Sequence, residues 1–361
     1  MSGEPLQRPL PRGEDSRAIL ERLRHVAPYG FGASSLGNLY RPVEDEVARQ
    51  SVVACWECGI RYFDTAPYYG FGLSERRLGD ALRGFDRSEY LLSTKVGRLL
   101  HPVDRPRDQC GFHSPMPFDP VYDYSYDGVM RSFEASLHRL GLSRIDILYA
   151  HDLGSATHGP RHAEMFATAM DSGYRALAEL RRQCVVGAIG LGVNEVEVCE
   201  ASLAHADFDL FMVAGRHTLL NHRSLDFLER CRRRGIGVVA AGVFNSGILA
   251  TGASAGQRGH YDYETAPPQV TARVAELETI CRDFDVPLPA AALQFAAAHP
   301  AVTCVVIGTA DPRRVRENAA LARLPIPAAF WGALRQRGLL SVEAPVPSND
   351  MNSSRRPEEP M

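Results

Sequence analysis

The sequence predicts a single-domain α/β protein, a closed (β/α)8 TIM barrel with long βα loops and disordered termini. Eight short apolar runs typical of buried strands alternate with longer helical patterns, which implies parallel strands joined by helical crossovers. The length of 361 residues fits one such barrel with insertions. An open doubly wound sheet is the competing fold, but its G-x-G-x-x-G fingerprint is absent after the first strand. The barrel is therefore the favoured architecture.

The strands are expected where short β-branched or apolar runs are bounded by turn residues. Glycines that can end the preceding helix stand before several of them, for example Gly59, Gly141, Gly187 and Gly235. The eight expected strands cover residues 31–36, 61–64, 90–95, 145–150, 188–192, 208–213, 236–241 and 303–308. Helices are expected after each strand in turn, at 43–58, 73–83, 126–140, 172–183, 194–204, 222–234, 270–284 with 288–298, and 312–323.

Both ends of the chain are rich in Pro, Arg, Glu and Ser, a composition typical of poorly ordered segments. We therefore expect a flexible N-terminal arm at residues 1–27, a barrel at 28–342 and a disordered tail at 343–361. Within the arm, the sequence EDSRAILERLR could form a short helix. No linker indicates a second domain.

Three stretches are longer than ordinary βα loops: 96–125, 153–170 and 250–268. All three follow strands, so they belong to the C-terminal face of the barrel, where barrel enzymes have their active sites. Long loops in compact folds are commonly functional, and surface decoration is the alternative. The third stretch could act as a mobile flap over a ligand.

Composition excludes several classes of partner. The formal net charge of −3 gives no electrostatic basis for binding nucleic acid or anionic membrane, and no apolar run approaches the roughly 20 residues of a membrane helix. We expect a cytoplasmic monomer or homodimer that acts on a small molecule. Cys55 and Cys58 form a C-x-x-C, but it lies in a helical pattern without a second such pair, so core packing is expected rather than a metal site.

Four polar residues follow or end consecutive predicted strands. Asp64 ends the second strand, Tyr69 lies in the loop after it, Lys95 ends the third strand and His151 follows the fourth. In a barrel these positions meet at one rim, although they span almost ninety residues of sequence. Each has a simpler alternative, such as an N-cap, a packed aromatic, a solvated strand end or a structural histidine. The joint arrangement favours chemistry.

The four residue types match the requirements of proton transfer to a carbonyl or alcohol oxygen. A phenol titrates near ~10 in water, and a buried cation beside it favours the phenolate. We expect Lys95 to lower the pKa of Tyr69 in this way, Asp64 to position Lys95, and neutral His151 to orient the substrate oxygen.

The blocks that contain these residues resemble the aldo-keto reductase family. FDTAPYYG, SERRLGDAL, STKVG, RLGLSRIDILYAHD and IGLGVN are similar to family blocks in order and spacing, and the resemblance covers about residues 28–325. LGNLYRPV, AGRHTLL and FNSGILATG resemble the branch of D-threo-aldose 1-dehydrogenases, which includes L-fucose, L-galactose and pyridoxal 4-dehydrogenases.

The resemblance implies a catalytic tetrad of Asp64, Tyr69, Lys95 and His151, and an NAD or NADP cofactor extended across the rim. Asn194 matches the asparagine that binds the carboxamide, and Tyr40 and Tyr68 are candidate substrate contacts. The other positions that match the cofactor site are Phe244, Asn245, Ser246 and Gly247 near the pyrophosphate and Gly308, Thr309, Arg314, Glu317 and Asn318 near the adenosine.

The resemblance also implies the reaction. Many relatives have a lysine where Gly308 stands, which tilts the cofactor choice toward NAD, although Arg314 could still bind NADP. The expected activity is oxidation of an aldose such as L-fucose, D-arabinose or L-galactose at C1 to a lactone. The alternatives are an NADPH-dependent carbonyl reductase of broad specificity and a cofactor-sensing regulatory barrel without turnover.

Overall fold

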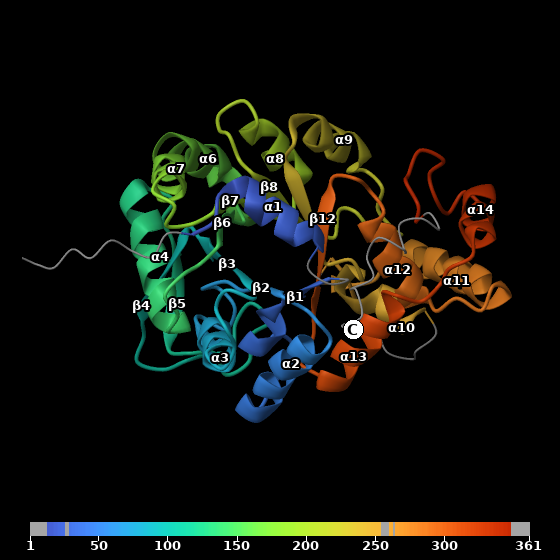
Figure 1. Ribbon diagram of the computed structural model, residues 1–361, viewed down its shortest axis with the longest axis horizontal. Helices are drawn as coiled ribbons and strands as arrows, with labels where there is room; N and C mark the ends of the chain where they lie inside the picture. The colour runs from blue at the N-terminus through green and yellow to red at the C-terminus, as the bar shows by residue number, and fades with distance from the viewer. Residues whose placement is uncertain (1–12, 26–28, 254–259, 263, 348–361) are drawn as a thin grey trace, which may run out of the picture.

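The computed structural model describes residues 13–25, 29–253, 260–262 and 264–347. Eight parallel strands close into a barrel in the order β1-β12-β9-β8-β7-β6-β3-β2, with helices around the outside (Figure 1), which confirms the predicted fold. These strands are β1 (Gly30–Gly32), β2 (Tyr62–Asp64), β3 (Leu91–Val96), β6 (Ile147–His151), β7 (Ala188–Val193), β8 (Leu210–Ala214), β9 (Gly237–Ala241) and β12 (Val302–Gly308).

The first strand is shorter than predicted. We expected a strand at 31–36, but β1 ends at Gly32 and a 3-10 turn follows at Ala33–Gly37. This turn packs against the loop after β2, since a Cβ on Gly37 would lie 2.5 Å from the carbonyl carbon of Tyr69. Residues 31–36 alternate small and apolar side chains, a pattern that resembles a strand. The turn is explained by the contact of Gly37 with the Tyr69 loop, which the sequence pattern does not reveal.

The predicted helices are all present, with ends shifted by a few residues. α4 begins after Ser125, whose hydroxyl accepts a hydrogen bond from Gly128 N (3.1 Å), and α13 begins after Asp311, which accepts one from Arg313 N (2.9 Å). The helices are α2 (Asp45–Glu57), α3 (Leu73–Leu82), α4 (Tyr126–Leu140), α7 (Tyr174–Arg182), α8 (Val196–Ser202), α9 (Leu225–Arg234), α11 (Pro268–Asp283), α12 (Leu288–Ala297) and α13 (Pro312–Leu321).

One further helix, α14 (Ala328–Gln336), was not predicted. Its Phe330 and Trp331 are buried against α11 and α12 in an apolar cluster outside the barrel. The same cluster includes Ala344, and Arg335 Nη2 donates to the Ala344 carbonyl oxygen (2.8 Å). The described residues continue to 347, past the expected barrel boundary at 342, and the rest of the tail lies outside them.

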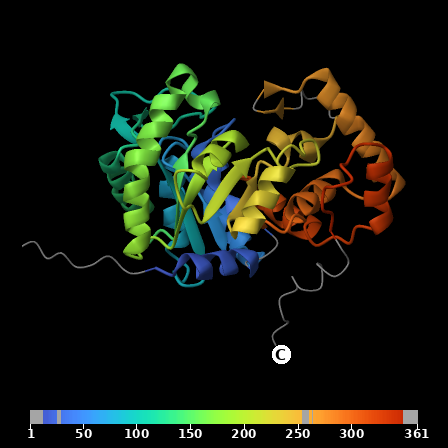
Figure 2. The same ribbon diagram turned by 90° about the horizontal axis from the view of Figure 1, so that it is seen from above.

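The expected flexible arm contains a helix that closes one end of the barrel. α1 (Ser16–His25) buries Ile19 and Leu23, which are four residues apart and so share one face. Both join the apolar cluster inside the barrel, and Figure 2 shows α1 lying across one end of the strands. The short helix that EDSRAILERLR predicted within residues 1–27 is therefore present and packs against the barrel.

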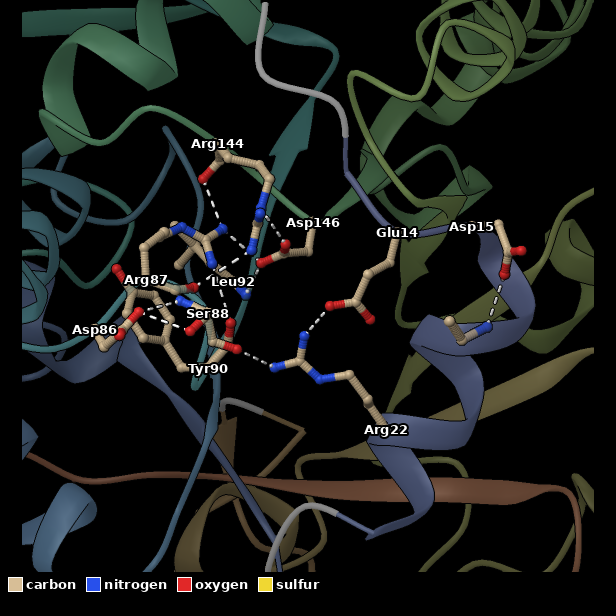
Figure 3. A network of polar contacts seen from close by, with 11 residues as sticks. Glu14, Asp15, Arg22, Asp86, Arg87, Ser88, Tyr90, Leu92, Arg144 and Asp146 are labelled. Atoms are coloured by element: carbon tan, nitrogen blue, oxygen red, sulfur yellow. Dashed lines mark hydrogen bonds and ion pairs between the residues drawn. The ribbon is translucent and has the colours of Figure 1, made fainter.

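A polar network fixes the same end of the molecule (Figure 3). Asp146 precedes β6 and is buried, and its carboxylate accepts hydrogen bonds from Arg87 (2.6 Å), Arg144 (2.9 Å) and the Leu92 amide (2.8 Å). From α1, Arg22 pairs with Glu14 and donates to the Ser88 carbonyl (3.0 Å). In the described part of the chain, α1 and this network therefore cover one end of the barrel.

The three long stretches lie at the opposite face. Residues 96–125 contain the antiparallel hairpin β4 (Arg98–Pro102) and β5 (Phe118–Tyr122), and 153–170 contain α5 (Ser155–His158) and α6 (His162–Thr168). The expected flap at 250–268 includes β10 (His260–Tyr261) and β11 (Glu264–Thr265), while its residues 254–259 and 263 lie outside the described part. No helix in the described ranges is long and apolar enough to cross a bilayer.

Candidate active site

A cavity of about 1160 Å³ opens at the C-terminal ends of the strands. It extends from Lys95 and His151 on one side to the beginning of α13 on the other. Every site residue predicted from the sequence lines this cavity, including Asn194, Arg314 and both substrate candidates, Tyr40 and Tyr68. The structure therefore brings together residues that are separated by more than 250 positions in the chain.

The floor of the cavity holds a buried ion pair. Lys95 Nζ donates to Asp64 Oδ2 (2.6 Å) and to the Thr65 carbonyl oxygen (2.8 Å), and both charged side chains are 4% exposed or less. Ser93 Oγ donates to the other oxygen of Asp64 (2.6 Å). Burial raises the pKa of Asp64, while Lys95 and these hydrogen bonds oppose the rise. The position of the ammonium is thus fixed by two acceptors.

Tyr69 lies over this ion pair. Lys95 Nζ is 4.8 Å from the centroid of the Tyr69 ring, and the rings of Tyr69 and His151 meet edge to face with centroids 5.8 Å apart. Tyr69 therefore lies beside both Lys95 and His151, as the sequence predicted for residues at one rim. Within the described part of the chain, the ammonium's hydrogen bonds go to Asp64 and Thr65, and its contact with Tyr69 is with the ring.

The electrostatic state of Tyr69 differs from the sequence-based expectation. We expected Lys95 to lower the pKa of the phenol, but burial raises this pKa well above its usual value, and the carboxylates of Asp64 and Asp152 add to the rise. The cation that opposes the rise is Arg98. The expectation was wrong because Asp64 neutralises Lys95 at 2.6 Å, so the pair has little net charge to offer the phenol.

His151 is held by one hydrogen bond at its backbone and one at its ring. Its carbonyl oxygen accepts a hydrogen bond from Tyr124 OH (2.6 Å), and its Nδ1 accepts one from Arg98 Nη1 (2.8 Å). Burial, together with the charges of Arg98 and Lys95, holds the pKa of His151 well below its usual range. The imidazole is therefore neutral, as the sequence analysis expected of a hydrogen-bond donor.

A row of hydroxyls connects Asp64 with the barrel interior. Ser93 Oγ, which donates to Asp64, lies 2.9 Å from Tyr62 OH, and this phenol lies 3.2 Å from Tyr149 OH. Burial raises the pKa of both phenols well above the usual value, so they are neutral hydrogen-bonding groups. This row satisfies polar atoms that would otherwise be unpaired in the apolar core.

Comparison with known proteins identifies the family of this chain. The family model for the "Aldo/keto reductase family" matches residues 28–337. The chain belongs to the aldo/keto reductase family. It is 43% identical to pyridoxal 4-dehydrogenase from Microbacterium luteolum over 91% of this chain and 99% of that protein. It is 40% identical to D-threo-aldose 1-dehydrogenase from Pseudomonas sp over 87% of this chain and 95% of the relative.

Solved structures show the same architecture. An aldo-keto reductase from Bacillus halodurans, in its holo form, superposes with a TM-score of 0.66 at 25% identity, covering 90% of this chain and 95% of that chain. The protein is thus an aldo-keto reductase family oxidoreductase with a (β/α)8 barrel. Aldo-keto reductases act on small carbonyl substrates with NAD(P)H.

The far side of the cavity fits a dinucleotide. Its volume of about 1160 Å³ exceeds the roughly 300–1,000 Å³ of a pocket for a drug-sized ligand, which leaves space for a cofactor and a small substrate. Arg314 lines this side and has no ion pair with any described residue, whereas its neighbour Arg313 pairs with Asp311 (3.2 Å). An unpaired guanidinium beside a helix N-terminus suits a phosphate group.

The other cofactor candidates are also placed at the cavity. Asn194 follows β7, and its carbonyl oxygen accepts a hydrogen bond from Arg216 Nε (2.5 Å). The Nη1 atom of Arg216 forms an ion pair with Asp262 (3.0 Å). Asn245 and Ser246 form a turn with left-handed backbone at φ 46° and 57°, and so present a bend of the chain to the cavity. Arg216 was not among the predicted site residues, because one arginine in a loop carries no specific signal.

The substrate side contains further residues that sequence reasoning missed. Arg98 and Asp152 line the cavity and form a salt bridge (2.7 Å), and Phe112, Tyr122 and Cys110 complete the wall. A signal did exist, because Asp152 directly follows His151 and Arg98 lies three residues after Lys95. In a barrel, charged residues that directly follow a strand are active-site candidates in the same way as the residues that end the strand.

Proposed function

We propose that this protein is an NAD(P)-dependent dehydrogenase that oxidises an aldose at C1 to the corresponding lactone. The observation that carries the proposal is the convergence of Tyr69, His151 and the Lys95–Asp64 pair at the floor of one cavity. Support for an aldose comes from the relative that is a D-threo-aldose 1-dehydrogenase, 40% identical over most of both chains.

Each residue has a defined part in this reaction. Tyr69 takes the proton of the C1 hydroxyl in the oxidative direction and returns it in the reductive direction. His151 donates a hydrogen bond to the same oxygen, and the Lys95–Asp64 pair fixes the floor beneath the phenol. The bound nicotinamide supplies the acceptor for the hydride from C1. Much of the rate then comes from holding the reacting groups in contact.

The cofactor would be held by Asn194 at the nicotinamide end, by residues 244–247 at the pyrophosphate and by Arg314, Glu317 and Asn318 at the adenosine. NAD is slightly favoured because Gly308, which lines the cavity, offers no cation for a 2′-phosphate. Arg314 remains able to bind NADP through a bidentate contact.

A cyclic hemiacetal of pyridoxal is a second candidate substrate. The cavity wall includes the rings of Tyr68 and Phe112, whose centroids are 5.4 Å apart in an edge-to-face contact, and Tyr122. Such a wall suits a flat heteroaromatic ring, and the pyridoxal 4-dehydrogenase relative is 43% identical. Oxidation would proceed through the same residues.

The test is an absorbance assay of nicotinamide reduction against L-fucose, D-arabinose, L-galactose and pyridoxal, run with NAD and then with NADP. We expect turnover with an aldose and a preference for NAD. Turnover confined to NADPH and simple aldehydes would replace the proposal with a broad carbonyl reductase. Tight cofactor binding without turnover on any substrate would instead indicate a regulatory barrel.

The raised pKa of Tyr69 predicts opposite pH dependences for the two directions of the reaction. Because the phenol is protonated at neutral pH, the base needed for oxidation is formed only as pH rises, so kcat/KM for oxidation should increase about tenfold per pH unit through neutrality. Reduction uses the protonated phenol and should stay constant until alkaline pH. Profiles in both directions measure this, and an oxidative plateau that begins below neutral pH would contradict it.

A further inference from the structure

Arg98 is a buried cation on the substrate side of the cavity, and its guanidinium contacts two aromatic rings, a carboxylate and an imidazole. Only 4% of it is exposed, and its guanidinium lies 4.2 Å from the centroid of the Tyr68 ring and 4.8 Å from that of Tyr122. Nη2 donates to Asp152 Oδ2 (2.7 Å) and to Tyr122 OH (3.2 Å), and Nη1 donates to His151 Nδ1 (2.8 Å). The rings of Tyr68 and Tyr122 and the Asp152 carboxylate together hold the guanidinium in its orientation.

The backbone on both sides supports this orientation. Arg98 follows Gly97, which has φ of 100° and on which a Cβ would lie 2.2 Å from the ring of Tyr124. Asp152 has φ of 48°, in the left-handed region that Asp tolerates better than most side chains, and its amide donates to the Gly192 carbonyl (2.9 Å). This left-handed turn directly after His151 accompanies the contact of the Asp152 carboxylate with Arg98.

The contact with His151 has only one chemical interpretation. A guanidinium has donors and no acceptor, so the Nδ1 atom that it faces must be unprotonated. In a neutral imidazole the proton is then on Nε2, the other ring nitrogen. The Asp152 carboxylate lies 3.5 Å from Nε2 and favours a proton there as well. Both charged neighbours therefore select the same tautomer.

We propose that Arg98, held in place by Asp152, is a positioning residue that locks His151 in the neutral Nε2–H tautomer, so that its one proton is available to the substrate oxygen. This inference deepens the proposed function and rests on it for the role of His151. In this role Arg98 contacts neither the reacting oxygen nor the hydride acceptor. It acts through the imidazole.

The charges around the ring make the lock independent of pH over a wide range. Burial and the two cations hold the pKa of His151 well below its usual range, so the ring stays neutral through neutral and mildly acidic pH. The titratable or charged groups that face or approach the ring are Arg98, Asp152, Lys95, Tyr68 and Tyr69, with His158 beyond Tyr124. Of these, Arg98 contacts a ring nitrogen directly.

The direct test is NMR of the imidazole nitrogens in the full-length protein labelled with ¹⁵N-histidine, with the His151 signals assigned by their loss in His151→Asn. We expect an unprotonated Nδ1 and a protonated Nε2 in the wild type, unchanged across neutral and mildly acidic pH. In Arg98→Met, the ring should become a mixture of tautomers, and the pKa of His151 should rise above its wild-type value while burial and Lys95 still hold it below the usual histidine range. A protonated Nδ1 in the wild type, or an unchanged tautomer in Arg98→Met, would overturn the proposal.

Kinetics supply the second readout. Arg98→Met should lower kcat about 100-fold and add an acidic limb to the pH profile, with cofactor Kd unchanged. Arg98→Lys keeps a charged donor and should recover most of kcat. Because Arg98→Met leaves Asp152 as a buried unpaired carboxylate, Arg98→Met/Asp152→Asn provides a variant with the wild-type net charge that should show the same tautomer change. An unaltered pH profile in both variants would count against the lock.

A matched control separates this role from loss of a buried arginine. Arg139 on α4 pairs with buried Glu75 (2.5 Å) outside the cavity, so Arg139→Met should reduce stability but leave the His151 tautomer and the pH profile unchanged. Since the NMR measurement needs no substrate, it also separates the two proposals. The expected tautomer in a protein that oxidises none of the tested substrates would refute the proposed reaction and leave the role of Arg98 standing.

Discussion

Replacement of Tyr69 by phenylalanine is expected to abolish turnover while cofactor binding survives. The substitution removes one hydroxyl and keeps the ring that packs against Lys95 and His151. In the proposed reaction the phenol is the group that exchanges a proton with the substrate oxygen, because His151 is neutral with a low pKa. We expect kcat to fall by at least about 10³-fold, within the range that proton-transfer groups contribute.

The measurement is steady-state kinetics in both directions together with cofactor titration by protein fluorescence. Tyr126→Phe is the matched control, since its hydroxyl donates to Glu179 (2.9 Å) between two outer helices and should be dispensable for turnover. Retention of normal kcat in Tyr69→Phe would disprove the proton-transfer role. Loss of cofactor binding in the same variant would show instead that the ring supports the cofactor.

Replacement of Lys95 by methionine should damage both stability and activity. The methionine leaves Asp64 buried without its cation, and breaking a buried ion pair in this way costs about 3–5 kcal/mol of folding free energy. The phenol also loses the group beneath its ring, so kcat should fall to a level similar to that of Tyr69→Phe. Chemical denaturation and steady-state kinetics measure the two effects.

The double variant Asp64→Asn/Lys95→Met separates stability from catalysis. Removing both charges relieves the unpaired carboxylate, so most of the lost stability should return, whereas kcat should stay low. If the double variant regained activity, the ion pair would be a structural feature without a catalytic role. If Lys95→Met were as stable as the wild type, the tight burial of the pair would be contradicted.

The local sequence determined the elements of this protein and their order. Apolar runs and helical periodicity located all eight strands and the helices between them, because each element buries one face against the same core. Polar residues at the strand ends, such as Asp64 and Lys95, could be assigned to one rim because parallel strands bring their carboxyl ends together. These conclusions follow from short-range patterns and the topology of the barrel.

Tertiary structure alone decided the features that depend on neighbours distant in sequence. α1 is ordered because Ile19 and Leu23 fill the closed end of the barrel, and a charged, proline-rich context hid that contact. Burial raises the pKa of Tyr69, and the carboxylates of Asp64 and Asp152 add to the rise, which no sequence pattern reveals. The contact of Arg98 with His151 likewise depends on the fold, because Arg98 begins the hairpin strand β4. Electrostatic environments are set by distance and burial, and the order of residues in the sequence specifies neither.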